Sequence, residues 1–130
     1  MWDEQHLWWF LPRGYLLTVA IELPILWFAL SRRHLPTVRL VAGFWLTAVT
    51  YPIVVVVLPL GLGSDVPRWL YLAIAETFAP VAECLLFYFA YVTSLPSDHK
   101  ATARDLSAIV AANLASFAAG ELYWYLYSRS

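Results

Sequence analysis

The chain has 130 residues, of which 62% are hydrophobic and 13% are charged, and its formal net charge is -1. Soluble domains carry about twice that share of charged residues, so the composition excludes a soluble monomer and a disordered chain. The near-neutral charge excludes a basic surface for nucleic acid. A single cysteine excludes an internal disulfide and any site that needs several thiolates. The composition therefore predicts an all-α integral membrane protein, with the lipid bilayer as its surroundings.

Apolar segments of about 20 residues, the length needed to cross about 30 Å of hydrocarbon, follow one another along the chain. The polar breaks between them lie at residues 31–36, 61–68 and 94–100, and each contains a proline. Such short connections make sequential helices antiparallel neighbours. We therefore expect one membrane domain over residues 1–130, a four-transmembrane-helix bundle. Its expected spans cover about residues 14–31, 38–62, 69–93 and 101–127.

The segment before the first expected span is rich in tryptophan and has acids in place of a basic start. Trp2, Trp8 and Trp9 are amphipathic rings of the kind that settle among lipid headgroups. No small-residue cleavage site follows, so the pattern is not typical of a signal peptide. Residues 1–13 are expected to form a short interfacial helix.

Basic residues predict the orientation of the chain. The first and third breaks, with the span ends beside them, carry five Lys or Arg residues, against three on the opposite side. The positive-inside rule places these two breaks in the cytoplasm and both termini outside. The Glu-x-Pro, Thr-Tyr-Pro and Gly-Glu elements resemble those of small prokaryotic membrane proteins, which favours a prokaryotic inner membrane and implies no activity.

The first two spans weakly resemble the last two. Glu22 aligns with Glu83, and the pair Thr47 and Thr50 aligns with Asn113 and Ser116. Two helices per unit give parallel repeats, related by an axis along the membrane normal. A real repeat would make the bundle pseudo-symmetric, with these polar side chains facing its interior.

Four glutamates lie inside the expected spans: Glu22, Glu76, Glu83 and Glu121. An acid at the centre of a membrane helix costs about 2.5–3.5 kcal/mol, and no Lys or Arg lies at mid-span to pair with it. At a rise of about 1.5 Å per residue, Glu22, Glu76 and Glu121 fall at one depth and Glu83 lies deeper. Such carboxylates suit a proton path or the oxygen ligands of a cation, whose identity stays open. The alternative for Glu76 and Glu121 is solvation at the membrane interface.

Uncharged polar residues accompany the acids. Thr47, Thr50 and Asn113 lie within the spans, where a hydroxyl or an amide needs a partner. We expect them to complete the lining of the ion- or proton-binding site. The histidines, His34 included, fall at expected surfaces, which argues against an imidazole metal site inside the bilayer, and no cofactor is expected.

Small residues recur every four positions in the last span. Such a stripe lets another helix approach closely, and helix packing is its expected role, within the bundle or against a partner. The stripe consists of Ala108, Ala112, Ser116 and Gly120.

Three functions are compatible with these features. The first is a small membrane protein, expected as a homo-oligomer, that binds or conducts a proton or cation through an acidic interior. The second is a non-catalytic accessory subunit whose acids and small-residue stripe contact a membrane-protein partner. The third is a membrane-embedded enzyme acting on a lipid-like substrate, which the lack of a catalytic motif disfavours.

Overall fold

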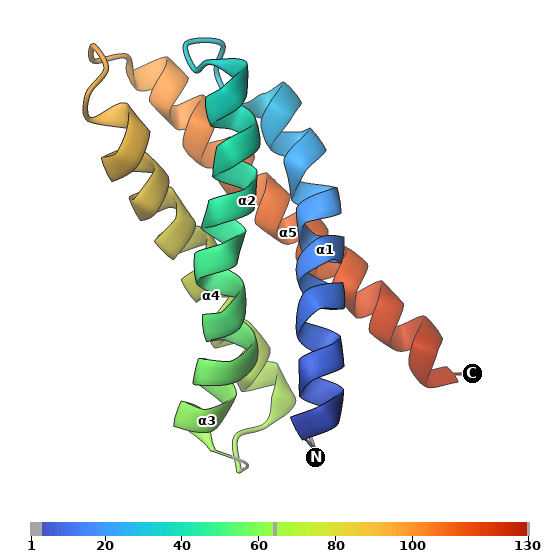
Figure 1. The fold of residues 1–130 in the computed structure, drawn as a ribbon. Coiled ribbons are helices and arrows are strands. Elements are labelled where there is room, and N and C mark those ends of the chain that lie inside the picture. The colour runs from blue at the N-terminus through green and yellow to red at the C-terminus, as the bar shows by residue number, and fades with distance from the viewer. Residues whose placement is uncertain (1–3, 64, 130) are drawn as a thin grey trace.

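The computed structural model describes residues 4–63 and 65–129, with the side chains of residues 12–63, 65–123, 125 and 126. The described chain is helical and contains no strand (Figure 1). Two of its elements, η1 and η2, are short π-helical stretches that continue the helix before them. The elements are α1 (Glu4–Ala29), α2 (Pro36–Pro52), η1 (Ile53–Val57), α3 (Leu58–Leu62), α4 (Arg68–Phe87), η2 (Tyr88–Val92) and α5 (His99–Arg129).

Three helical stretches within the described residues are long and apolar enough to cross a membrane. They are Pro36–Leu62, Arg68–Val92 and His99–Tyr123, and they lie where the second, third and fourth spans were predicted. By length and composition the chain is therefore a helical membrane protein. Helix α1 is not among the three, and the side chains of its residues 4–11 lie outside the described part of the chain. A first span in α1 stays a prediction.

Helix α1 differs from the expectation at its N-terminal end. Its backbone is helical without a break from Glu4 to Ala29, through Pro12 and Pro24. The expected interfacial segment and the first expected span therefore form one continuous helix, because a proline removes one N–H donor without preventing the turns on either side. Trp2 lies outside the described residues, and so do the side chains of Trp8 and Trp9.

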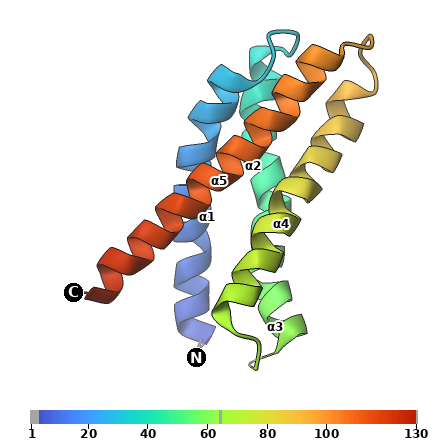
Figure 2. The same cartoon turned by 180° about the vertical axis from the view of Figure 1, so that it is seen from behind.

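Each long helix packs mainly against two others. Helix α1 contacts α2 and α5, and α4 contacts the same two helices. Helix α5 crosses the others at an angle, as the front and back views show (Figures 1 and 2). The loops before α2 and before α5 lie together at what we call the two-loop end, and the start of α1, the end of α5 and the loop after α3 lie at the termini end. Which end faces the cytoplasm stays a prediction.

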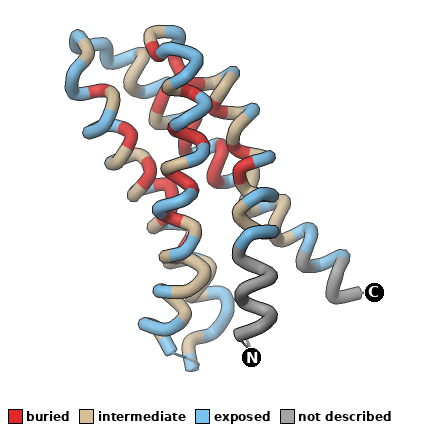
Figure 3. The backbone as a smooth tube through the Cα atoms, viewed as in Figure 1, coloured by how far each residue is buried: buried red, intermediate tan, exposed pale blue. Residues whose placement is uncertain are grey.

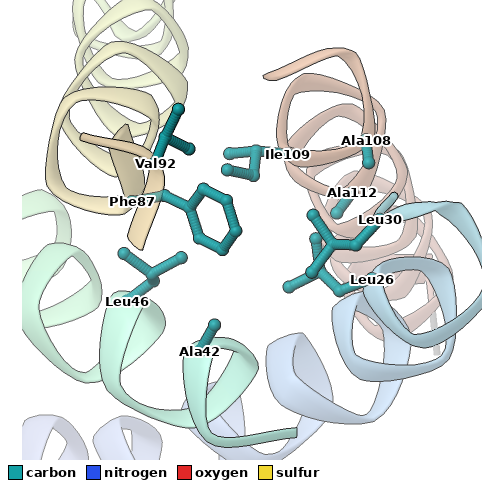
Figure 4. Close-up of a cluster of buried hydrophobic side chains, with 9 residues drawn as sticks. All are labelled: Leu26, Leu30, Ala42, Leu46, Phe87, Val92, Ala108, Ile109 and Ala112. Carbon is teal, nitrogen blue, oxygen red and sulfur yellow. The ribbon is translucent and has the colours of Figure 1, made fainter. Parts of the chain in front are cut away.

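Buried residues gather in the half of the molecule next to the two-loop end (Figure 3). The ring of Phe87 is fully buried and points between the helices (Figure 4). Toward the termini end, η1 and α3 contain no buried residue. The core is therefore closely packed at one end and open at the other. It consists of Leu26, Leu30, Ala42, Leu46, Phe87, Val92, Ala108, Ile109 and Ala112.

The small-residue stripe of α5 is divided between two environments. Ala108 and Ala112 belong to the buried core, where their size lets α5 approach its neighbours. Ser116 and Gly120 are partly exposed. The C-terminal part of α5 diverges from the other helices (Figure 2).

Gly43 of α2 provides a close approach to α1. A Cβ atom at this position would lie 2.6 Å from Cδ1 of Leu23. At Gly120 of α5, nothing lies within 4 Å of the place that a Cβ atom would take. Of these two glycines, only Gly43 has a neighbour at the place of its Cβ atom, and that neighbour is the end of the Leu23 side chain.

We expect Gly43→Val to push α1 away from α2 and to lower the free energy of unfolding by about 1–3 kcal/mol, the usual cost of overpacking. Thermal unfolding in detergent is the measurement, and Gly120→Val is the matched control because it meets open space. Equal unfolding temperatures for the two variants would contradict the close approach at Gly43.

Candidate functional site

Five buried polar side chains from α1, α2, α4 and α5 lie in the interior, each between 2% and 7% exposed. We call this set the polar layer. All five were predicted from the sequence as site residues. They are Glu22 on α1, Thr47 and Thr50 on α2, Glu83 on α4 and Asn113 on α5.

Glu83 has partners on two other helices. The side-chain nitrogen of Asn113 donates to Oε2 of Glu83, and the hydroxyl of Thr50 lies 3.2 Å from Oε1. The nitrogen of Asn113 also donates to the carbonyl of Ile109 at 2.9 Å. The hydroxyl of Thr50 also lies 3.1 Å from the carbonyl of Leu46. Glu83 thus links α4 to both α2 and α5.

Glu22 has much weaker support. The hydroxyl of Thr47 donates to its Oε2 over 3.4 Å, near the limit for a hydrogen bond. The residue is only 3% exposed, and no described residue offers it another hydrogen bond or an ion pair. Glu22 lies close enough to Glu83 and Glu76 to interact with them electrostatically. The polar layer therefore holds two acids and, among the described residues, no basic partner for either.

The other two predicted glutamates lie outside the polar layer. Glu121 forms an ion pair with Arg68 at 2.8 Å, with side chains 35% and 55% exposed. The expectation that no basic residue pairs with these acids is wrong for Glu121, because α5 crosses at an angle that brings it to the first residue of α4. Glu121 therefore does not join Glu22 in one site. Glu76 is partly buried and is near enough to Glu83 and Glu121 to interact with both.

One contact follows the predicted two-helix repeat. Glu22 pairs with Thr47 between α1 and α2, and Glu83 pairs with Asn113 between α4 and α5, which are aligned positions. The second aligned pair differs, because Thr50 contacts Glu83 whereas the hydroxyl of Ser116 donates to the carbonyl of Asn113 at 3.0 Å. The repeat stays a prediction that this single contact matches.

A second buried polar cluster lies at the two-loop end, and the sequence analysis missed its centre, Asp105. Its carboxylate is fully buried, and Oδ1 accepts the backbone N–H of Ser31 at 2.6 Å. Oδ2 lies 2.9 Å from Nη2 of Arg33 and 2.7 Å from Nε2 of His34. His34 is 5% exposed, so its predicted surface position is wrong. The turn after α1 folds the imidazole inward, edge-on to the ring of Phe87.

The signal for this cluster was present in the sequence. Arg33 and His34 occupy the first polar break, and Asp105 lies near the start of the last helix, at the same end of the molecule. An acid placed there can meet the basic break without crossing the membrane.

Two arginines cap the C-terminal end of α1 by donating hydrogen bonds to its last carbonyls. Arg39 donates to the carbonyl of Trp27 at 3.0 Å, and Arg104 donates to the carbonyls of Ala29 and Phe28 at 2.9 and 3.3 Å. Carbonyls in the last turn of a helix lack helical N–H partners. The arginines therefore satisfy groups that would otherwise be unpaired at this end.

The ligand chemistry of the polar layer is limited. Among the residues that the structure describes, no three His, Cys, Asp or Glu side chains are grouped to hold a metal ion. Carboxyl and hydroxyl oxygens are ligands of the kind that calcium takes, but Asn113 turns its nitrogen, not its oxygen, toward Glu83. Comparison with known protein families, with curated proteins and with solved structures gives no match to this chain. Functional inference therefore starts from the polar layer itself.

We expect Asp105→Asn to lower the free energy of unfolding by about 3–5 kcal/mol, because it leaves buried basic groups without their counter-charge. Glu121→Gln is the comparison on the same helix, and breaking its exposed ion pair is expected to cost about 0–1 kcal/mol. Chemical unfolding in detergent measures both. Similar small losses in the two variants would show that Asp105 does not hold the two-loop end together.

Proposed function

We propose that the protein is a four-helix membrane bundle that binds a proton in the polar layer and passes it across the membrane. The observation that carries this proposal is the burial of Glu22 and Glu83 with only hydroxyl and amide partners among the described residues. Two uncompensated buried charges would cost several kcal/mol each. A proton on the pair removes much of that cost, and two neighbouring carboxyls bind it as a unit.

Helix α1 acts as the fourth spanning helix in this proposal. Its 26 residues give a length of about 39 Å at about 1.5 Å per residue, more than the hydrocarbon core requires. It packs against α2 and α5 and carries Glu22 to the same interior as Glu83. Without α1 in the membrane, the polar layer would lie open to lipid on one side.

The contacts of Thr50 favour a proton on Glu83. A hydroxyl has one hydrogen to donate, yet that of Thr50 has two oxygen neighbours, the carbonyl of Leu46 and Oε1 of Glu83. When Glu83 is protonated, it donates to Thr50, and Thr50 donates to Leu46. When Glu83 is ionised, the hydroxyl of Thr50 turns to it. Thr50 therefore serves both protonation states of Glu83 without moving its oxygen.

The amide of Asn113 favours a proton over a metal cation. Its nitrogen donates to both Glu83 and the carbonyl of Ile109, so it presents hydrogens to the carboxyl. A cation beside Glu83 needs oxygen ligands. In this orientation the amide stabilises the carboxyl in the interval between losing one proton and gaining the next.

The test is proton flux into liposomes that contain the purified protein, with Glu22→Gln/Glu83→Gln as the inactive variant. We expect the wild type to carry protons and the double variant to lose that flux, because neutral amides cannot exchange a proton with the route. A pH-sensitive dye inside the vesicles reports protons, and parallel sodium and potassium gradients report cations.

Glu121→Gln is the matched control, since Glu121 is an acid on a packed helix that lies outside the polar layer and pairs with Arg68. It should conduct like the wild type. Folded, inserted protein without proton flux, or equal flux in the double variant, would overturn the proposal. If sodium or potassium flux is observed and the double variant loses it, the transported ion in the proposal becomes that cation in place of the proton.

Thr50→Val tests the relay by the hydroxyl. Losing one hydrogen bond, worth about 1 kcal/mol, is expected to slow proton flux about fivefold to tenfold. Thr77→Val is the control, because Thr77 donates to the carbonyl four residues back, as Thr50 can, but has no carboxyl neighbour in its hydrogen bonds. Unchanged flux in Thr50→Val would show that its hydroxyl takes no part in proton transfer.

A further inference from the structure

We propose that the proton reaches the polar layer from the termini end through Glu76, and that a layer of four apolar side chains closes the route to the two-loop end. This inference rests on the proposed function, since it describes the path to the same two carboxyls. We call the closing set the apolar layer. It consists of Leu26 on α1, Leu46 on α2, Phe87 on α4 and Ile109 on α5.

The termini side of the polar layer is loosely packed. Thr50 is the last buried residue of α2, and Asn113 is the last one of α5 among its described side chains. Neither η1 nor α3 has a buried residue, and the first in α4 is Ala75. In Figure 3 the positions on this side are mostly intermediate or exposed. Buried residues on this side are fewer and include Val19, Ala75 and Ala79, and the proposal takes water to approach the carboxyls from the termini end.

Helix α4 carries acids along that approach. Glu76 is partly buried and Glu83 is 2% exposed. The two lie seven residues apart, about two helical turns, so they occupy the same face at an axial separation of about 10 Å. Glu76 interacts electrostatically with Glu83 and Glu22 on its inner side and with Glu121 on its outer side. It is the one acid, among the described residues, that lies between the surface and the polar layer.

The backbone beside Glu76 adds an acceptor to this path. Pro80 lies inside α4 and has no N–H, so the carbonyl of Glu76 lacks the donor that a helix normally provides four residues on. In the proposed path, a chain of water molecules between Glu76 and Glu83 donates to this carbonyl.

The apolar layer lies one turn beyond the polar layer on every helix. Leu26 follows Glu22 by four residues and Phe87 follows Glu83 by four, whereas Leu46 and Ile109 precede Thr50 and Asn113 by four on the antiparallel helices. Its members are 0% to 4% exposed, and in Figure 4 they converge between the helices. A water molecule needs two to four polar partners, which this layer does not offer. Protons therefore stop here unless a side chain moves.

Phe87 is the side chain whose movement would open the route. Its ring lies 5.1 Å, between centroids, from the ring of His34, which contacts Asp105. Phe87 thus separates the polar layer from the polar cluster at the two-loop end. Displacing it brings the two polar regions into contact through water.

The first experiment measures proton flux in liposomes for Glu76→Gln and Glu76→Asp. We expect the glutamine variant to slow flux about a hundredfold, as loss of a proton-transfer group does, and the aspartate variant to keep most of the rate. This rescue by the shorter acid separates a proton-carrying role from a packing role. Wild-type flux in Glu76→Gln would overturn the entry route.

The second experiment compares Phe87→Ala with Phe87→Leu. Opening the layer is expected to raise flux about tenfold in the alanine variant, and the leucine variant should stay near the wild type. Ile109→Ala tests the same layer from α5 if Phe87→Ala does not fold. If Phe87→Ala and Ile109→Ala fold but neither raises proton flux, the proposed barrier is overturned.

The two proposals fail in distinguishable ways. Loss of flux in Glu22→Gln/Glu83→Gln, together with unchanged flux in Glu76→Gln and Phe87→Ala, would leave the proposed function standing and overturn the route. Wild-type flux in Glu22→Gln/Glu83→Gln would overturn both. Phe87→Ala is expected to raise proton flux, and adding Glu22→Gln/Glu83→Gln to that variant is expected to remove it. This result would support both the proposed function and the route.

Discussion

A carboxyl group that water does not reach has to find its hydrogen-bond donors and its counter-charge inside the protein, and this requirement governs the interior of the chain. Glu83 obtains donors from Thr50 and Asn113, which lie on two other helices. Glu22 obtains one long contact from Thr47. These bonds need α1, α2, α4 and α5 to converge at one depth. The apolar core begins one turn further on and fixes that convergence, so the packing and the polar layer depend on each other.

The two buried acidic regions differ in how their charge is compensated. Asp105 has Arg33, His34 and the N–H of Ser31 around it, so the protein itself neutralises its charge and the cluster has a structural role. Glu22 and Glu83 have no such cation among the described residues, which is the ground for our proposal that a proton neutralises them. The same kind of side chain is therefore fully paired at the two-loop end, and in the middle of the helices it has the exposed fraction and partners on which the proposed proton binding rests.

The sequence predicted those features that a single helix carries by itself. The apolar stretches of α2, α4 and α5 follow from length and composition, and the five residues of the polar layer were found because polar side chains are costly within a span. Features that depend on two helices together were missed. The ion pair of Glu121 with Arg68 depends on the angle of α5, and the burial of His34 depends on the turn after α1. The apolar layer was not predictable, because Leu26, Leu46, Phe87 and Ile109 look like every other apolar residue in their spans until the helices are aligned.

The size of the chain gives the apolar layer its importance. Four packed helices enclose only one set of facing side chains at each depth, and interiors of this kind are filled as densely as crystals of small molecules. There is thus no room for a permanent water-filled channel beside Phe87, which is fully buried. A proton that crosses has to wait for a rare rearrangement of one or two side chains. In so small a bundle, the proposed barrier is a single turn of helix thick, and it lies directly beside the carboxyls that we propose hold the proton.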